Sequence, residues 1–364
     1  MSVPLYLANA WYAAAFSAEL SSTPLRRTLL GEPVALYRGA SGRAAALRDR
    51  CPHRFAPLHK GQVFGDDLRC PYHGLRFDPQ GACVHNPIGE GKVPKAACVR
   101  SFPLAERDGI VWMWWGDAPA DESRIRRWPE FEDGARYTSV QGHIRVRGDY
   151  QLVADNLLDL SHAEFLHPYL ATEGFNRRTR YSMEQQGHTV IARNWRPSEP
   201  ISPLFAFAYG EGAPTHVDHL SIVRWEPPST LRLEIGVSPP GRPPADGPRS
   251  YQAHLVTPET EGRCHYFWKW GRDFRLEDHG FSSRLQENLQ QAFETEDEPM
   301  IEAQFENMAG QTLEALEPVL LPTDSASLRA RRVLQQLIER QRQPSSATPD
   351  PSLSSDPSRT PHAR

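Results

Sequence analysis

The sequence predicts an α+β protein, with an all-β N-terminal part and a longer part that combines an antiparallel sheet with helices. The first 120 residues alternate short apolar runs with Gly and Pro, which is typical of short strands joined by tight turns. Apolar residues at helical spacing begin only after residue 150. From residue 343 onward Ser and Pro dominate. We therefore expect domains at 1–120 and 121–342 and a disordered tail at 343–364.

In the N-terminal part, residues 34–37 are predicted to form a strand that a turn at 39–42 follows. Asp108-Gly109 predicts a tight hairpin turn that leads into a strand over 110–115. Charge and Pro rise through residues 117–133, which favours a linker between the two domains.

In the second part, helices and strands are both expected. The apolar spacing predicts a helix over 155–167, a long helix over 282–307 with a kink near Pro299, and a last helix over 325–342. Alternation predicts strands over 231–237 and 265–270, with a Pro/Gly-rich loop at 239–248 between them.

The composition excludes several classes of protein. The chain has 41 Lys and Arg against 45 Asp and Glu, so its formal net charge is -4 and gives no electrostatic case for nucleic acid or an anionic membrane as partner. It shows neither a secretory signal nor an apolar run long enough for a membrane span. Five cysteines favour a reducing, cytoplasmic setting, where clustered cysteines more often bind metal than form disulfides.

Two Cys/His pairs lie in the N-terminal part. They are Cys51-Pro52-His53 and, sixteen residues later, Cys70-Pro71-Tyr72-His73-Gly74. Two such pairs on two short loops can close around one small inorganic site, and thiolates suit iron–sulfur clusters or zinc. Two Cys on one iron and two His on the other form the Rieske arrangement of a [2Fe-2S] cluster.

A structural zinc site is the alternative for these four residues. Zinc sites usually pair Cys with Cys and His with His, whereas each pair here is mixed, so we predict the cluster. Cys83 and Cys98 do not have the spacing of an extra disulfide beside such a cluster. We expect both to be ordinary buried thiols.

A second set of metal-ligating residues lies in the predicted helix 155–167. Its members are Asn156, Asp159, His162 and His167. Five residues of ideal helix turn through about 500°, so the two imidazoles would diverge by about 140°. A shared metal requires the helix to end or deform near His167, and Pro168 is consistent with such an end. A polar surface helix is the alternative, but two His among carboxylates and Asn favour metal binding.

Two His and one carboxylate on one face of an iron form the triad of non-haem Fe(II) oxygenases. The carboxylate must come from another segment, and the acidic run 294–298 in the long predicted helix is the candidate region. Sequence physics alone does not choose among these acids, because most such acids lie on a solvated face.

The two sets together resemble the Rieske non-haem iron oxygenases. In that family C-x-H-x16-C-x2-H is followed by N/E-x2-D-x2-H-x4-H, which here is Asn156, Asp159, His162 and His167. The resemblance implies a Rieske domain followed by a catalytic domain of the helix-grip type. It also implies a [2Fe-2S] cluster on Cys51, His53, Cys70 and His73, and a mononuclear Fe(II) that uses O2. The stretch from Phe293 resembles the family's F-x-x-E-D, which implies Asp297 as the third iron ligand, with Glu296 or Glu294 as alternatives.

The resemblance also implies partners and roles. The family forms head-to-tail homotrimers in which the cluster of one subunit faces the iron of the next. Asp159 would bridge the two, bonded to its own His162 and to His73 of the partner subunit, and Asn156 would stand beside it as a catalytic residue. Electrons would come from NAD(P)H through a ferredoxin-type reductase with FMN and a plant-type [2Fe-2S] centre, because this sequence has no flavin or nicotinamide fingerprint.

Within the family, the chain is similar to vanillate and dicamba O-demethylase oxygenase components. The similar segments are Asn9-Ala10-Trp11-Tyr12, Thr257-Pro258-Glu259, His265-Tyr266-Phe267-Trp268 and Arg331-Arg332-Val333. This implies oxidation of a methoxy carbon of a small aromatic acid, which gives a phenol and formaldehyde. Aryl-methyl hydroxylation and ring or diaryl-ether dioxygenation by the same centre are alternatives.

Two further segments are candidates for the substrate site. Residues 203–209 are apolar and could line a pocket or pack on the core. His254 could anchor an acid group, although a lone His is more often structural. The rival of a different class is an electron-transfer Rieske protein with a non-catalytic binding domain, and the second metal site argues against it.

Overall fold

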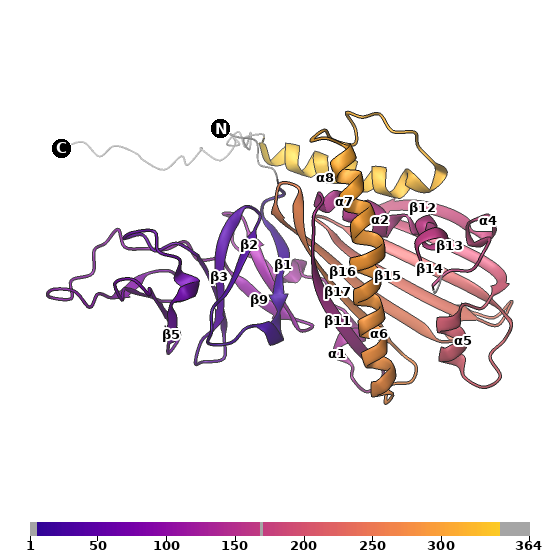
Figure 1. Cartoon of the computed structure of the whole chain (residues 1–364), viewed down its shortest axis with the longest axis horizontal. Helices are drawn as coiled ribbons and strands as arrows, with labels where there is room; N and C mark the ends of the chain where they lie inside the picture. Colours follow the sequence, from indigo (N-terminus) through magenta and orange to yellow (C-terminus); the bar gives the residue numbers. More distant parts are fainter. Residues whose placement is uncertain (1–5, 168–169, 343–364) are drawn as a thin grey trace, which may run out of the picture.

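The computed structural model describes residues 6–167 and 170–342 (Figure 1). The predicted disordered tail at 343–364 and Pro168 lie outside these residues. Small β-sheets make up one end of the molecule, and a large sheet with helices makes up the other. The α+β prediction is confirmed.

Three small antiparallel sheets form the N-terminal part. They are β1 (Ala10–Phe16), β10 (Ile110–Trp115) and β9 (Leu104–Arg107); β2 (Leu25–Leu29), β3 (Glu32–Arg38) and β4 (Ala44–Arg48); and β5 (Gln62–Phe64), β6 (Asp67–Arg69), β7 (Arg76–Phe77) and β8 (Cys83–His85). The predicted strands lie within β3 and β10. The predicted hairpin is confirmed, since φ is 58° at Asp108 and 76° at Gly109, as a type I′ turn requires.

One seven-stranded antiparallel sheet is the core of the second part. Its order is β11 (Thr138–Val146), β17 (Arg263–Arg272), β16 (Arg249–Thr260), β15 (Thr230–Ser238), β14 (His216–Glu226), β13 (Thr189–Pro200) and β12 (Arg180–Gln186). The predicted strands lie within β15 and β17. The two parts pack directly on each other: Thr257 Oγ1 donates to the Ala13 carbonyl at 2.7 Å, and the rings of Phe16 and Phe267 meet edge to face.

Helices lie against this sheet and at its edges. The α-helices are α1 (Pro129–Glu132), α2 (Tyr150–Leu158), α3 (Ala163–Leu166), α4 (Phe175–Arg178), α5 (Pro203–Tyr209), α6 (His279–Ala292), α7 (Glu298–Asn307) and α8 (Ser325–Arg342). Short 3-10 turns are η1 (Ser17–Glu19), η2 (Leu58–Lys60), η3 (Glu122–Arg124), η4 (Leu160–His162), η5 (Pro244–Asp246) and η7 (Pro322–Asp324), and η6 (Phe293–Asp297) is a π-helical turn. Helices α6 and α7 form one nearly continuous rod in front of the sheet (Figure 1). In the described part of the chain, no helix is long and apolar enough to cross a membrane.

Four expectations need correction in detail. The helix expected over 155–167 begins at Tyr150, because the Asp149 side chain caps it, and is broken after Leu158. The helix expected over 282–307 is interrupted by the π turn at 293–297, just before the predicted kink. The stretch 117–133, predicted as a linker, is partly structured: it contains η3 and α1, and Trp128 within it is fully buried.

The fourth correction concerns the two cysteines outside the Cys/His pairs. Cys98 is exposed and Cys83 is only half-buried, so the expectation that both are buried is wrong. Cys98 pairs with Ala82 in an isolated bridge after the exposed loop 89–96, where little of the chain covers it.

Candidate metal centres

The loops after β4 and β6 carry the four predicted cluster ligands in closely similar turns. The Cys51 amide donates to the Ala56 carbonyl, and the Cys70 amide donates to the Leu75 carbonyl. The fourth residue after each cysteine has a left-handed backbone, with φ of 57° at Phe55 and 77° at Gly74. At Gly74 a Cβ would also lie 2.9 Å from the Pro87 ring, so glycine is required there for two reasons.

The two turns bring thiols and imidazoles together in pairs. Cys51 and Cys70 are buried, whereas the rings of His53 and His73 lie nearer the surface with centroids 4.6 Å apart. Contact between the two thiols is the largest influence on both: it raises the pKa of Cys51 and lowers the pKa of Cys70. A thiolate is therefore favoured in the pair, which is the form that binds metal.

This pairing fits a two-iron cluster better than a single zinc. Among the described residues, only one group of three or more His, Cys, Asp or Glu has all its ligand atoms within 4.8 Å of one another, and it does not include these four. The ligand atoms around one tetrahedral zinc would lie within about 4 Å of one another, given bonds of about 2.0–2.3 Å. Two thiols on one side and two imidazoles on the other are the donors that a [2Fe-2S] cluster with mixed ligands needs.

The compact group is His162, His167 and Asp297. Asp297 Oδ1 lies 3.6 Å from His162 Nε2 and 3.3 Å from His167 Nε2. The break after Leu158 makes this convergence possible, because His162 ends the 3-10 turn η4 and His167 follows the last residue of α3. The π turn similarly ends at Asp297, which is 6% exposed although its acidic neighbours are more exposed. Two imidazoles and one carboxylate would hold iron from one side.

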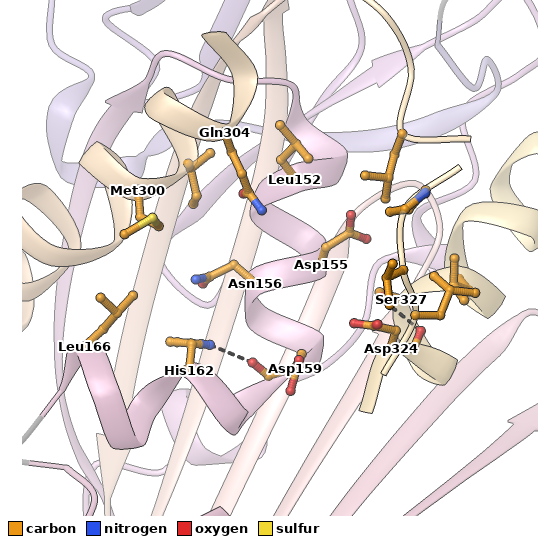
Figure 2. A pocket seen from close by; sticks show the side chains of 16 residues that line it. Leu152, Asp155, Asn156, Asp159, His162, Leu166, Met300, Gln304, Asp324 and Ser327 are labelled. Atoms are coloured by element: carbon orange, nitrogen blue, oxygen red, sulfur yellow. Dashed lines mark hydrogen bonds between the residues drawn. The ribbon is translucent and has the colours of Figure 1, made fainter. Parts of the chain in front are cut away.

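Both imidazoles are oriented through their other nitrogen. His162 Nδ1 lies 2.6 Å from the Asp159 main-chain carbonyl (Figure 2), and His167 Nδ1 lies 2.5 Å from Glu296 Oε2. Such partners fix which ring nitrogen faces a metal. Nε2 of each ring is therefore the atom that points at Asp297.

Protonation of two of the three groups agrees with a ligand role; for the third, burial acts to lower the pKa of His167, but its contacts with Asp297 and Glu296 outweigh burial and raise that pKa. Burial lowers the pKa of His162, so the ring is favoured in its neutral form. Burial acts to raise the pKa of Asp297, but its contacts with His167, His162 and Asn156 outweigh burial and hold that pKa below its usual range. Neutral imidazole and ionised carboxylate are the forms that bind a metal.

Asn156 and Asp159 lie at this group but contact different atoms. Asn156 Nδ2 donates to Asp297 Oδ1 at 3.0 Å. The Asp159 carboxylate does not bond to His162; it accepts from the Ser161 amide at 2.9 Å and from Thr323 Oγ1 at 3.1 Å. Asp159 and His162 also line an outer groove of about 310 Å³ between α2, α7 and the segment before α8 (Figure 2).

A second, inner cavity of about 120 Å³ also meets the group, between α2, α6 and the large sheet. His162, His167 and Asp297 line it together with apolar side chains such as Leu157, Leu233 and Phe293. A metal held by the three residues would thus lie at the wall of a mostly apolar cavity, and one of its ligands, His162, also lines the outer groove.

Comparison with known proteins identifies the family. The Rieske [2Fe-2S] domain matches residues 10–103, and the vanillate O-demethylase oxygenase C-terminal domain matches residues 146–340. The chain is 41% identical to the oxygenase component of dicamba O-demethylase from Stenotrophomonas maltophilia over 91% of this chain and 98% of that protein. It is 38% identical to the oxygenase component of chloroacetanilide N-alkylformylase from Rhizorhabdus wittichii over 93% of this chain and 98% of that protein. A crystal structure of dicamba monooxygenase bound to 3,6-dichlorosalicylic acid superimposes with a TM-score of 0.86 at 40% identity, over 92% of this chain and 98% of that one.

The chain belongs to the Rieske oxygenase family. As an oxygenase component it is an enzyme that uses a Rieske cluster and non-haem iron, and a partner reductase supplies its electrons. The predicted cofactors and enzyme class are confirmed.

In this Rieske oxygenase, His254 lines the inner cavity from strand β16 and is 2% exposed. Its Nδ1 lies 2.6 Å from the Tyr266 hydroxyl, and its buried Nε2 has no hydrogen-bond partner in the described part of the chain. Burial lowers the pKa of His254 to about 3, so the ring is neutral at physiological pH. The apolar segment 203–209 forms helix α5. Two of its residues, Leu204 and Phe205, line the same cavity.

Three features of the site were not predicted from the sequence. Glu296 was expected only as an alternative ligand, yet it holds His167 through Nδ1. Thr323, which contacts Asp159, carries no signal in the sequence. A buried group of Arg196, Glu199 and His219 lies on β13 and β14, and Glu199 Oε1 lies 2.6 Å from His219 Nδ1. The one signal in the sequence that could have indicated this group is the presence of charged residues within strands, where they are rare.

Proposed function

We propose that this Rieske oxygenase demethylates a small methoxylated aromatic acid, consuming O2 and electrons from NAD(P)H and releasing a phenol and formaldehyde. The observation that carries the proposal is the His162–His167–Asp297 group at the wall of a mostly apolar cavity. Its relatives include O-demethylase oxygenase components for dicamba and vanillate. When bound, the iron would supply the activation of O2 at this wall.

The residues of the chain would position the substrate. Leu157, Leu233 and Phe293 would hold an aromatic ring and exclude water. With the Tyr266 hydroxyl donating to Nδ1, His254 carries its proton on Nε2 and can donate it to a substrate oxygen. Leaving that buried nitrogen without a partner would be costly, which supports a polar group of the substrate there.

The first experiment measures metal, sulfide and product together. About three irons and two sulfides per chain, with a Rieske EPR signal after reduction by dithionite, are expected from one cluster plus one iron. Methoxybenzoates should then release formaldehyde in proportion to O2 consumed. Oxidation of a methylbenzoate to the benzyl alcohol without demethylation would favour the alternative reaction. Two irons that Fe(II) does not raise to three would favour an electron-transfer protein.

We further propose that three subunits assemble head to tail and that electrons cross between them. In one chain the cluster loops and the iron group lie in different lobes (Figure 1). Phe55 and Tyr72 beside the cluster turns are 67% and 65% exposed, and Phe165 and Val319 near the outer groove are 78% and 92% exposed. Apolar side chains this exposed on two surfaces favour a contact that covers both.

Asp159 is the proposed bridge in that contact. Its carboxylate lines the outer groove, while its carbonyl already holds His162. It would accept a hydrogen bond from His73 of the partner subunit. Asp159→Asn should keep about three irons and the Rieske signal but lose turnover, because electrons no longer reach the iron. Gln304→Ala, in the same groove, is the control and should stay active; full activity of Asp159→Asn would contradict the bridging role.

The reductase is proposed to be of the ferredoxin type, with FMN and a plant-type [2Fe-2S] centre driven by NAD(P)H. Such a donor suits the cytoplasm, where thiols stay reduced, and so do cysteines that form no disulfide in the described part of the chain.

A further inference from the structure

A row of basic side chains crosses the small sheet β5–β8 beside the cluster loops. Gln62 pairs with Arg69, Arg69 with Arg76, and Arg76 with His85, so these residues occupy neighbouring strands at the same level of one face. Arg69, Arg76 and His85 line a groove of about 570 Å³ together with Lys60. We call these four residues the basic row.

The positive charge of the basic row is not neutralised within its groove. The groove has no acidic residue in its lining. Arg69 donates to Gln62 Oε1 and stacks on Phe64, both uncharged. Residues 50–100 contain eight Lys and Arg against four Asp and Glu, whereas the whole chain has a net charge of -4. The basic row therefore lies in a positive region of an otherwise acidic protein.

The groove opens on the cysteine side of the cluster site. Cys70, Pro71 and Gly74 belong to its lining, and Arg69 directly precedes Cys70. His53 instead lines a separate groove with Pro52 and Ile88. The two sides of the cluster site thus present different surfaces, one basic and one apolar.

We propose that the basic row is the docking surface for an acidic electron-donor protein, so that electrons enter the cluster from the Cys70 side. This rests on the proposed function, in which a separate protein reduces the cluster and the histidine side faces the next subunit. On the sheet, Arg69, Arg76 and His85 span two strand intervals, about 10 Å, and Lys60 on η2 belongs to the same groove, so the row is longer than a small anion. Phe64, 40% exposed at the groove, adds the apolar contact that protein interfaces contain.

The position of the sheet also suits a partner. Strand β5 lies at the end of the N-terminal part that faces away from the large sheet (Figure 1). In the proposed step one electron leaves the reduced [2Fe-2S] centre of the donor and reduces the Rieske cluster. Rieske centres have higher potentials than plant-type centres, so the transfer runs downhill.

The test measures reduction of the cluster in the full-length enzyme by stopped-flow absorbance, with a reduced, acidic plant-type [2Fe-2S] ferredoxin as the probe. The second-order rate constant should fall as ionic strength rises, because opposite charges steer the encounter. Arg76→Glu should lower it about ten-fold or more at low ionic strength, and Lys60→Glu should also lower it. Arg284→Glu, an exposed site on α6, changes the net charge equally and should stay within about two-fold.

Dithionite provides the internal reference. It should reduce the cluster of every variant completely and give the wild-type Rieske spectrum, which shows that a slow ferredoxin reaction reflects docking and not a damaged cluster. Equal losses in Arg76→Glu and Arg284→Glu, or a rate that rises with ionic strength, would overturn the proposal. A single turnover of dithionite-reduced enzyme with a methoxybenzoate needs no donor protein, so its failure would count against the proposed function and not against the docking surface.

Discussion

Each imidazole of the candidate iron group is held at Nδ1 by a partner of a different kind. His162 uses a main-chain carbonyl, which no side-chain substitution removes, whereas His167 uses the carboxylate of Glu296. The carboxylate between them, Asp297, is the only one of its acidic run that joins the compact group. These contacts allow separate roles for ligand and positioning residue to be tested.

Asp297→Ala should remove the mononuclear iron and leave the Rieske cluster, because a triad without its carboxylate keeps only two ligands. Iron should fall from about three to about two per chain, with an unchanged Rieske EPR signal. Glu294→Ala is the control, since its side chain contacts Gln290 and not the histidines. Retention of the third iron in Asp297→Ala would show that the ligand is another acid.

Glu296→Gln should weaken iron binding without abolishing it. The amide can still accept a hydrogen bond from His167 Nδ1 but no longer carries charge, and loss of such a partner costs about 10- to 100-fold in metal affinity. Titration of the iron-depleted enzyme with Fe(II) measures the change. An affinity equal to that of the wild type would mean that Glu296 does not position the ring.

At the scale of elements, two irregular turns create the iron group. The break between α2 and α3 returns His162 and His167 to one side, although five residues of regular helix would separate them. The π turn at Phe293–Asp297 adds one residue to the rod formed by α6 and α7. Ile301, which is buried, fixes α7 beyond it.

Deletion of Thr295 should convert the π turn into ordinary α-helix, so that Asp297 no longer ends the widened turn that aims its carboxylate at the histidines. The mononuclear iron should be lost while the Rieske signal remains. Thr295→Ala keeps the chain length and should keep about three irons, because the threonine is exposed and bonds only to Gln291. A deletion variant with a full iron content would show that the π turn does not aim the carboxylate.

At the scale of the whole molecule, the half-buried His143 and the buried His265 join the two domains. His143 Nε2 lies 3.0 Å from His265 Nδ1, and His265 Nε2 lies 3.0 Å from the Thr28 carbonyl on β2. Arg27 stands beside them, 3.4 Å from His143 Nδ1. Burial lowers the pKa of His143 to about 3 and of His265 to about 4, so both rings are neutral in the folded protein.

Acid should therefore weaken this domain interface. Below about pH 6.5 these histidines bind protons in the unfolded chain but stay neutral in the folded protein. The free energy of unfolding therefore falls as pH falls. Between pH 7 and pH 5 each such histidine lowers the free energy of unfolding by about 2 kcal/mol. His143→Gln should lower this pH dependence, measured by denaturant unfolding at both pH values, and the exposed His188→Gln should not. A variant as acid-sensitive as the wild type would contradict this account.

The features that the sequence predicts are those that neighbours along the chain decide. Asp108-Gly109 makes a type I′ turn because both residues tolerate positive φ. The two Cys/His pairs and the cluster of Asn156, Asp159, His162 and His167 each fit within short segments, so spacing and residue type were enough to indicate two metal sites. The α+β class followed from changes in apolar periodicity, which local geometry imposes.

Tertiary structure decided the contacts between distant segments. Thr323 reaches Asp159 across 164 residues, and Glu296 reaches His167 across 129. Packing of α8 and α7 on the sheet determines these pairs, and periodicity holds no information about them. The same holds for the exposure of Cys98 and the inward turn of Asp297 among its acidic neighbours. Residue type and local spacing determine which groups can bind metal, whereas burial and the meeting of separate elements determine which of them share one site.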